Sequence, residues 1–124
     1  MRFAVIIPAA GRSVRFGTDK LRAELSGRPV IEVTLSRFLD RADVSRVIVP
    51  MSGDGVGIDH PKLTVCPGGA CRAASVLAGL EQLDASEEWV AVHDAARPLV
   101  SDELIGRVFA AAARDGAAGP AQAV

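Results

Sequence analysis

The stretch Ala4–Lys20, AVIIPAAGRSVRFGTDK, decides which fold the rest of the chain is expected to complete. Its apolar run Val5–Ile7 needs cover on both faces of a sheet, which predicts a central parallel strand rather than an edge strand. The small residues 8–11 then follow at the carboxyl end of that strand, where open α/β sheets bind their ligands. Because these residues have almost no side chain, backbone N–H groups could approach a phosphate closely.

Three cations, Arg12, Arg15 and Lys20, follow the small residues and could surround a triphosphate. The loop matches neither a Walker A motif nor a G-x-G-x-x-G dinucleotide fingerprint, so a solvated basic loop stays an alternative. Residues 1–28 contain six Arg or Lys and two acidic residues, an excess of positive charge that favours phosphate ligands. The net charge of the whole chain is −1, so nucleic acid is not an expected partner.

The composition fits one soluble globular domain covering residues 1–124, with 49% hydrophobic and 23% charged residues. No apolar run approaches the ~20 residues that a membrane span needs, and the N-terminus lacks a long apolar signal region. We therefore expect a cytoplasmic protein without a membrane partner. Cys66 and Cys71 are too few and wrongly spaced for a zinc site or a C-x-x-C pair, which predicts ordinary reduced thiols.

Strand and helix patterns alternate along the chain, which predicts an α/β fold with a mostly parallel sheet and helices on both faces. Apolar runs predict strands over residues 3–8, 44–51, 63–66 and 89–93. Helices are expected from 29 to about 42, after Gly68-Gly69, and from 102 to about 116. In the second helix the predicted buried stripe is Ala73, Val76, Leu77, Leu80 and Leu83. Residues 117–124 resemble the start of another strand, so we expect an incomplete domain.

Two further turns lie at the same predicted edge of the sheet as the first loop. Adjacent glycines at Gly68 and Gly69 would let the backbone approach a flat base or sugar, and Ser75 could add a hydroxyl. A plain strand-to-helix turn with Ser75 on the surface is the equal alternative. The second turn follows His93-Asp94, where a carboxylate could hold Mg²⁺ against phosphates.

The residues around Asp94 allow more than one interpretation. His93 follows an apolar strand, and we expect it to be packed and hydrogen-bonded rather than catalytic. Arg97, held by the following proline, either pairs with Asp94 or contacts a substrate phosphate. The remaining acids in turns and at helix ends are expected to be solvated surface groups: Asp40, Asp43, Asp54, Asp59, Asp84, Glu87 and Glu88.

Four motifs together, IIPAAGRSVRFG, GRPVIEVTLSRF, GGACRAASVLAGL and VHDAARPLVS, resemble the 2-C-methyl-D-erythritol 4-phosphate cytidylyltransferase family over the whole chain. The resemblance implies a Rossmann-like three-layer α/β/α sandwich, a Mg²⁺ requirement and a homodimer built through a β-arm. It also implies that CTP and methylerythritol phosphate are converted to CDP-methylerythritol and pyrophosphate in isoprenoid biosynthesis.

The resemblance also assigns roles to individual residues. It implies catalytic cations at Arg15 and Lys20, a metal or ribose carboxylate at Asp94, and a substrate contact at Arg97. The nucleotide-binding set that it implies is Pro8, Ala9, Ala10, Gly11, Gly69, Ala70 and Ser75.

The chain departs from the family pattern at several positions. Ser13 replaces a usual second glycine, and Ala70 and Cys71 replace an acidic pair. The family also continues beyond the position of Val124 with a dimer arm and a later catalytic lysine. We therefore expect this polypeptide alone to bind CTP weakly and to turn over slowly or not at all.

Two alternative functions stay open at this point. GRSVRFGTDKL and GRPV also resemble a molybdenum-cofactor nucleotidyltransferase, although VHDAARP favours the cytidylyltransferase. A non-catalytic nucleotide-binding half-domain is the other alternative.

Overall fold

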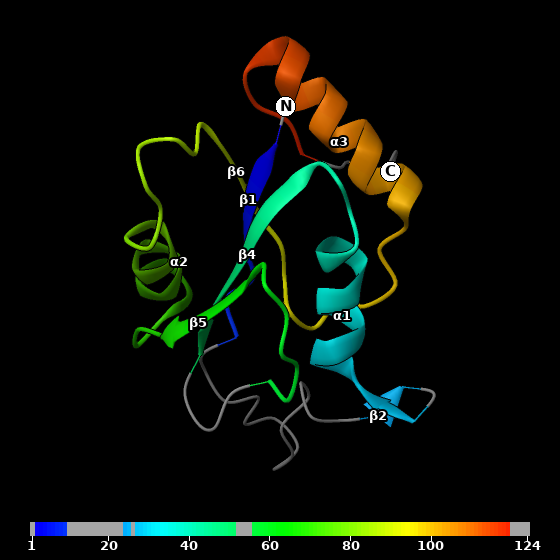
Figure 1. The fold of residues 1–124 in the computed structure, drawn as a ribbon, viewed down its shortest axis with the longest axis vertical. Helices are drawn as coiled ribbons and strands as arrows, with labels where there is room; N and C mark the ends of the chain where they lie inside the picture. The colour runs from blue at the N-terminus through cyan, green and yellow to red at the C-terminus, as the bar shows by residue number, and fades with distance from the viewer. Residues whose placement is uncertain (1, 10–23, 26, 52–55, 120–124) are drawn as a thin grey trace.

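The structure, a computed structural model, describes residues 2–9, 24–25, 27–51 and 56–119. Strands and helices alternate as the sequence predicts (Figure 1). Among the residues described, no helix has the length and apolar character that crossing a bilayer requires. The elements, in chain order, are β1 (Phe3–Ile6), β2 (Glu24–Leu25), β3 (Arg28–Pro29), α1 (Val30–Leu39), β4 (Val44–Met51), β5 (Leu63–Pro67), α2 (Arg72–Leu80), β6 (Trp89–Val92) and α3 (Asp102–Asp115).

The main sheet has the strand order β5-β4-β1-β6, and all three of its strand pairs are parallel. The prediction of a central first strand is confirmed, because β1 lies between β4 and β6 and all four of its residues are buried. Pairing continues past the end of β1, since Ile7 N donates to Ile48 O at 2.9 Å and Ala9 N donates to Pro50 O at 2.8 Å. This pairing carries the chain straight from the core to the carboxyl edge of the sheet.

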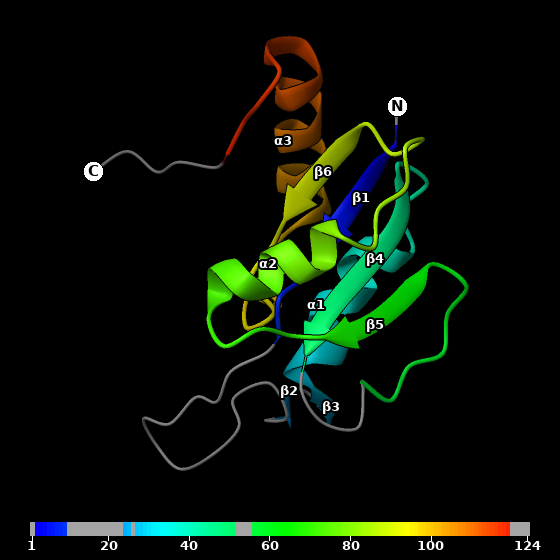
Figure 2. The ribbon, with the colours of Figure 1, turned by 90° about the vertical axis from the view of Figure 1, so that its left-hand side faces the viewer.

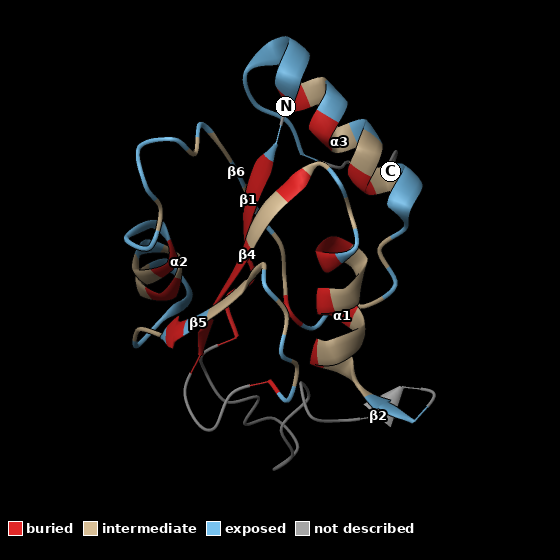
Figure 3. Cartoon of the chain, in the orientation of Figure 1, coloured by how far each residue is buried: buried red, intermediate tan, exposed pale blue. Residues whose placement is uncertain are grey.

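Helices cover both faces of the sheet, which makes a three-layer α/β/α arrangement and confirms the predicted fold class. Helices α1 and α3 lie on one face and α2 on the other (Figure 2). Alternation along β1 supplies both cores, because successive strand side chains point to opposite faces. Val5 joins the larger cluster with Leu35 of α1 and Phe109 of α3, whereas Ile6 packs with Ile48 in the smaller cluster beneath α2. Figure 3 shows the resulting buried band along the strands.

The predicted buried stripe of α2 is partly wrong. Ala73 is exposed, Leu77 and Leu80 are 56% and 41% exposed, and the buried residues of the helix are Ser75 and Gly79. A Cβ on Gly79 would lie 2.8 Å from Cγ2 of Ile6, which is closer than carbon atoms can approach. The small residues therefore face the sheet because they allow α2 to approach β1 more closely than leucine side chains would.

Helix α3 begins and ends where the sequence predicts. Ser101 is the N-cap, and its hydroxyl accepts a hydrogen bond from Leu104 N at 3.1 Å. At the other end, Gly116 adopts a left-handed φ of 88°, and its N–H donates to Ala112 O at 2.8 Å.

The two-residue strands β2 and β3 form an antiparallel hairpin that the sequence pattern did not predict.

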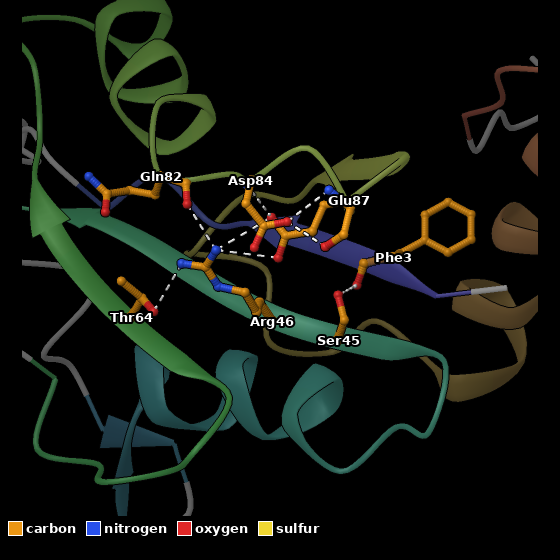
Figure 4. A network of polar contacts seen from close by, with 8 residues as sticks. Phe3, Ser45, Arg46, Thr64, Gln82, Asp84 and Glu87 are labelled. Carbon is orange, nitrogen blue, oxygen red and sulfur yellow. Dashed lines mark hydrogen bonds and ion pairs between the residues drawn. The ribbon is translucent and has the colours of Figure 1, made fainter.

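A polar network on the α2 side of the sheet holds the connection between α2 and β6 (Figure 4). Arg46 of β4 donates through Nη1 to Gln82 O at 2.8 Å and to both carboxylate oxygens of Glu87 at 3.3 and 3.4 Å. Glu87 also accepts from Asp84 N at 3.2 Å. The Glu87 side chain is only 8% exposed, so the interpretation of this residue as a solvated surface acid is wrong.

A second ion pair joins the start of β4 to α3. Arg41 donates from Nε and Nη2 to the two carboxylate oxygens of Asp43, both at 2.8 Å. The same guanidinium donates to Asp102 O at 3.0 Å and lies 5.5 Å from the ring centroid of Phe109. Hydrogen bonding to Arg41 lowers the pKa of Asp43 below its ordinary value. Asp43 is therefore a structural partner of Arg41 rather than a free surface charge.

Candidate functional site

Three connections meet at the carboxyl edge of the sheet, as the parallel topology requires. The segment 7–9 follows β1, the segment 68–71 follows β5, and the segment 93–98 follows β6. The first two are linked through the end of β4, because Ala9 N donates to Pro50 O at 2.8 Å and Gly68 N donates to Met51 O at 3.1 Å. Residues predicted from three separate motifs thus converge at one edge.

The first predicted loop is described only at its start. Pro8 and Ala9 are both buried and continue the line of β1, so they place the following residues beyond the end of the strand. The other predicted residues of this loop, Ala10, Gly11, Arg12, Arg15 and Lys20, lie outside the described residues.

The glycine turn before α2 is held from within by Ser75. The Ser75 hydroxyl is fully buried and accepts a hydrogen bond from Gly69 N at 3.0 Å. A Cβ on Gly69 would lie 2.4 Å from Cβ of Ala74, so glycine is required for this close approach of turn and helix. The alternative of a surface Ser75 is therefore wrong, and the hydroxyl shapes the turn instead of facing solvent. Ala70, in contrast, is exposed at the tip of the turn.

The segment after β6 closes on itself around Asp94. Oδ1 of Asp94 accepts from Ala96 N at 2.9 Å, and its backbone oxygen accepts from Arg97 N at 3.1 Å. Nε2 of His93 lies 3.0 Å from Arg97 O, and this nitrogen carries the proton because a carbonyl oxygen can only accept. The imidazole also packs against Phe38, with ring centroids 5.0 Å apart. The prediction of a packed, hydrogen-bonded His93 is confirmed.

Asp94 and Arg97 form an ion pair that a ligand could replace. Nε of Arg97 lies 3.6 Å from Oδ2 of Asp94, and the two side chains are 78% and 43% exposed, respectively. Exposed pairs of this kind contribute about 0–1 kcal/mol, so the guanidinium can turn toward an anion at little cost. The two alternatives for Arg97 do not exclude each other. Arg97 is paired with Asp94, and its guanidinium is exposed enough to reach a ligand.

An open cavity of about 920 Å³ lies beside this pair. Its polar lining includes Arg72, His93, Asp94 and Arg97, and its apolar lining comes mainly from β6, α3 and the segment between them. Arg72, the first residue of α2, was not among the predicted site residues. Its place directly after the glycine turn was the available signal, because the first residue of such a helix lies at the ligand-binding edge. Two guanidinium groups at one cavity suit an anionic ligand.

Asp94 is the predicted metal ligand. Among the described residues, no group of three or more His, Cys, Asp or Glu side chains could hold a metal ion. Mg²⁺ nevertheless often binds through one or two carboxylates, with phosphates and water completing its coordination. Asp94 is half-exposed and uses Oδ1 in one hydrogen bond, so lone pairs stay available, and its chemistry fits one protein ligand of a phosphate-bound Mg²⁺.

The amino-acid sequence from residue 3 to residue 124 matches a known protein family. A family model described as 2-C-methyl-D-erythritol 4-phosphate cytidylyltransferase matches residues 3–124. The chain belongs to this family. A relative of that name from Cereibacter sphaeroides is 43% identical over 131 residues, which cover 98% of the chain and 58% of the relative. One from Thermus thermophilus is also 43% identical, over 97% of the chain and 54% of the relative.

Solved structures support the same assignment. The Francisella tularensis 2-C-methyl-D-erythritol 4-phosphate cytidylyltransferase matches with a TM-score of 0.77 and 32% identity, over 91% of the chain and 52% of that structure. The Thermus thermophilus enzyme matches with a TM-score of 0.71 and 36% identity, over 94% and 52%, respectively. The chain thus spans about half the length of the family members it matches.

Proposed function

We propose that this chain forms the nucleotide-binding part of a cytidylyltransferase that joins CTP and 2-C-methyl-D-erythritol 4-phosphate and releases pyrophosphate. The observation that carries the proposal is the convergence of the glycine turn and the Asp94–Arg97 segment at one sheet edge, beside a cavity with two guanidinium groups. Membership of the family supplies the identity of the substrates. The chemistry at that edge suits a phosphate-rich ligand.

The proposed roles follow the position of each residue. Residues 8–11, with Gly69 and the exposed Ala70, would hold the nucleotide through close backbone approach. Arg97 would turn from Asp94 to the phosphate of the second substrate, and Arg15 and Lys20 would neutralise the triphosphate. Ser75 keeps a role in the nucleotide site, but an indirect one, because its buried hydroxyl holds Gly69.

The proposed reaction is a direct displacement at phosphorus. A phosphate oxygen of methylerythritol phosphate forms a bond to the α-phosphorus of CTP, and the bond from that phosphorus to the bridging oxygen breaks. Pyrophosphate leaves with the electron pair, so no covalent enzyme intermediate is required. The protein contributes by holding the two anions in line and by neutralising the charge that gathers on the leaving group.

We propose Mg²⁺ as the cofactor of this reaction. Asp94 would hold it, and the bound ion would neutralise charge on the phosphates. The residues of this chain would then orient the phosphates, with Arg97 near Asp94 and Arg72 at the start of α2.

The test is pyrophosphate release by the purified protein with Mg²⁺, methylerythritol phosphate and each of the four nucleoside triphosphates in turn. Of the four nucleotides, we expect only CTP to support release, and we expect that release to be slow for this polypeptide by itself. Use of GTP without CTP, with molybdopterin as the acceptor, would identify the molybdenum-cofactor alternative. Binding of Mg²⁺·CTP in a calorimeter with no turnover would identify a non-catalytic half-domain.

A matched pair of variants connects the activity to the site. Asp94→Asn keeps the side-chain shape and the hydrogen bond from Ala96 N but removes the negative charge that we propose binds Mg²⁺. The rate of pyrophosphate release should therefore fall at least about tenfold. Asp115→Asn, an exposed carboxylate at the end of α3, should leave activity unchanged. Equal activity in both variants would contradict the role of Asp94.

We also propose that the protein forms a homodimer, as the resemblance implies, and that it is cytoplasmic, as its composition leads us to expect. Sedimentation equilibrium and cell fractionation, respectively, would test them.

A further inference from the structure

Helix α1 contacts the Asp94 segment through two side chains on one helical face. Oγ1 of Thr34 donates to Ala95 O at 2.8 Å, and Nε of Arg37 donates to Pro98 O at 3.1 Å. Residues three apart in a helix lie on the same face, so the two bonds reach both ends of the 95–98 turn. Of the same motif, GRPVIEVTLSRF, Phe38 packs against His93 and lines the cavity.

The Thr34 hydroxyl is engaged where an apolar residue could have been placed. Thr34 is fully buried and Ala95 is 1% exposed. The hydroxyl has one proton and two carbonyl oxygens within reach, Val30 O at 3.1 Å and Ala95 O at 2.8 Å. The shorter distance favours donation to Ala95, because Val30 is already in the helix and Ala95 O is buried between elements.

One peptide group connects this hydrogen bond to the carboxylate of Asp94. The C=O of Ala95 and the N–H of Ala96 belong to the same planar unit and point in opposite directions. Thr34 holds the oxygen end at 2.8 Å, and Oδ1 of Asp94 accepts from the nitrogen end at 2.9 Å. The orientation of this peptide plane therefore constrains the position of Asp94 Oδ1, while Oδ2 faces Arg97.

We propose that Thr34 is a positioning residue, which orients the carboxylate of Asp94 through the Ala95–Ala96 peptide group. The role of that carboxylate toward Mg²⁺·CTP rests on the proposed function. The positioning itself is a property of the protein without ligand.

Hydrogen exchange tests the positioning without any ligand. Thr34→Val keeps the shape but removes the donor, so exchange at Ala96 N–H should accelerate about tenfold more than exchange at Val47 N–H, a core amide of β4. Thr34→Ser should restore the wild-type rate. Ser36→Ala is the matched control, because the Ser36 hydroxyl donates to Val33 O of its own helix at 2.7 Å and does not reach the 95–98 turn. Equal acceleration at Ala96 and Val47 in Thr34→Val would reduce Thr34 to a merely structural residue and overturn the proposal.

Calorimetry with Mg²⁺·CTP tests the consequence for the site. We expect Thr34→Val to weaken binding about three- to tenfold, as loss of one hydrogen bond does, with Thr34→Ser and Ser36→Ala near wild type. Unchanged affinity in Thr34→Val would overturn the link to the ligand. If the wild-type protein shows no affinity for Mg²⁺·CTP, the proposed function fails, and hydrogen exchange still decides the positioning role. Should Thr34→Val not fold, Thr34→Ala removes the same donor, and the same excess exchange at Ala96 is expected.

Discussion

Replacing Gly69 by alanine would place a methyl group where the structure has no room for it. The added Cβ would lie 2.4 Å from Cβ and 2.8 Å from the carbonyl carbon of Ala74. Carbon atoms in contact are about 3.5–4.0 Å apart, so the turn and the first part of α2 must separate by about 1 Å. That movement would also stretch the 3.0 Å hydrogen bond from Gly69 N to Ser75 Oγ.

The magnitude follows from two opposing effects. Overpacking of this kind destabilises a protein by about 1–3 kcal/mol. Alanine also restricts the unfolded chain, which stabilises the protein by about 0.4–1 kcal/mol, and Gly69 has no positive φ that alanine would strain. We therefore expect Gly69→Ala to lower the free energy of unfolding by about 1–2 kcal/mol. Affinity for Mg²⁺·CTP should fall as well, since the exposed tip at Ala70 moves with the turn.

Urea unfolding followed by the fluorescence of Trp89, the one tryptophan in the sequence, measures the change. Gly106→Ala in α3 is the matched control, because its added Cβ would meet Nη2 of Arg41 at an ordinary 3.6 Å. Helix propensity predicts that this variant is stabilised, by up to about 1 kcal/mol. If Gly69→Ala is as stable as Gly106→Ala, the close approach of the turn to α2 is not a constraint, and the reasoning is wrong.

Three further substitutions test the contacts that hold the layers together. Phe109→Ala removes a ring that stacks on Phe3 of β1, with ring centroids 4.0 Å apart, and should lower the free energy of unfolding by about 3–4 kcal/mol. A loss below about 1 kcal/mol would contradict the place of Phe109 in the core. Glu87→Gln keeps the shape but removes the charge facing Arg46, and should lower the free energy of unfolding in urea by about 1–2 kcal/mol; an unchanged midpoint would mean that this pair does not hold the connection. Arg41 depresses the pKa of Asp43, so the carboxylate stabilises the fold above the ordinary carboxyl pKa and loses that contribution as pH falls through the lowered value. Asp43→Asn should therefore lower stability at pH 7 by at most about 1 kcal/mol and weaken its pH dependence below about pH 4, whereas an identical acid unfolding profile would exclude this contribution.

Much of the fold could be predicted from local patterns. The run Val5–Ile7 had to be buried on both faces, and β1 is central for that reason. Ser101 and Gly116 mark the two ends of α3. The serine hydroxyl accepts a hydrogen bond from the first turn, and glycine adopts the positive φ that ends the last turn. Such signals can be recognised in a sequence because they act over a few residues.

The orientation of α2 could not be predicted in this way. Its leucines and its small residues lie on different faces, and a hydrophobic stripe favours burying Leu77 and Leu80. The deciding contact is between Gly79 and Ile6, residues far apart in the chain. Distance in sequence hides this kind of constraint, because shape complementarity exists only after the layers meet.

The candidate site also combines features that local patterns predict with contacts that depend on packing. Local sequence patterns were enough to predict which residues gather at the carboxyl edge, since parallel strands must all end there and the glycine turn, Asp94 and Arg97 follow strand ends. The contacts of each side chain became known from the packed structure. Ser75 turns inward to hold Gly69, and Thr34 reaches from α1 across 61 positions to Ala95. Hydrogen bonds between elements depend on directions set by packing, whereas the strand ends depend on local patterns alone.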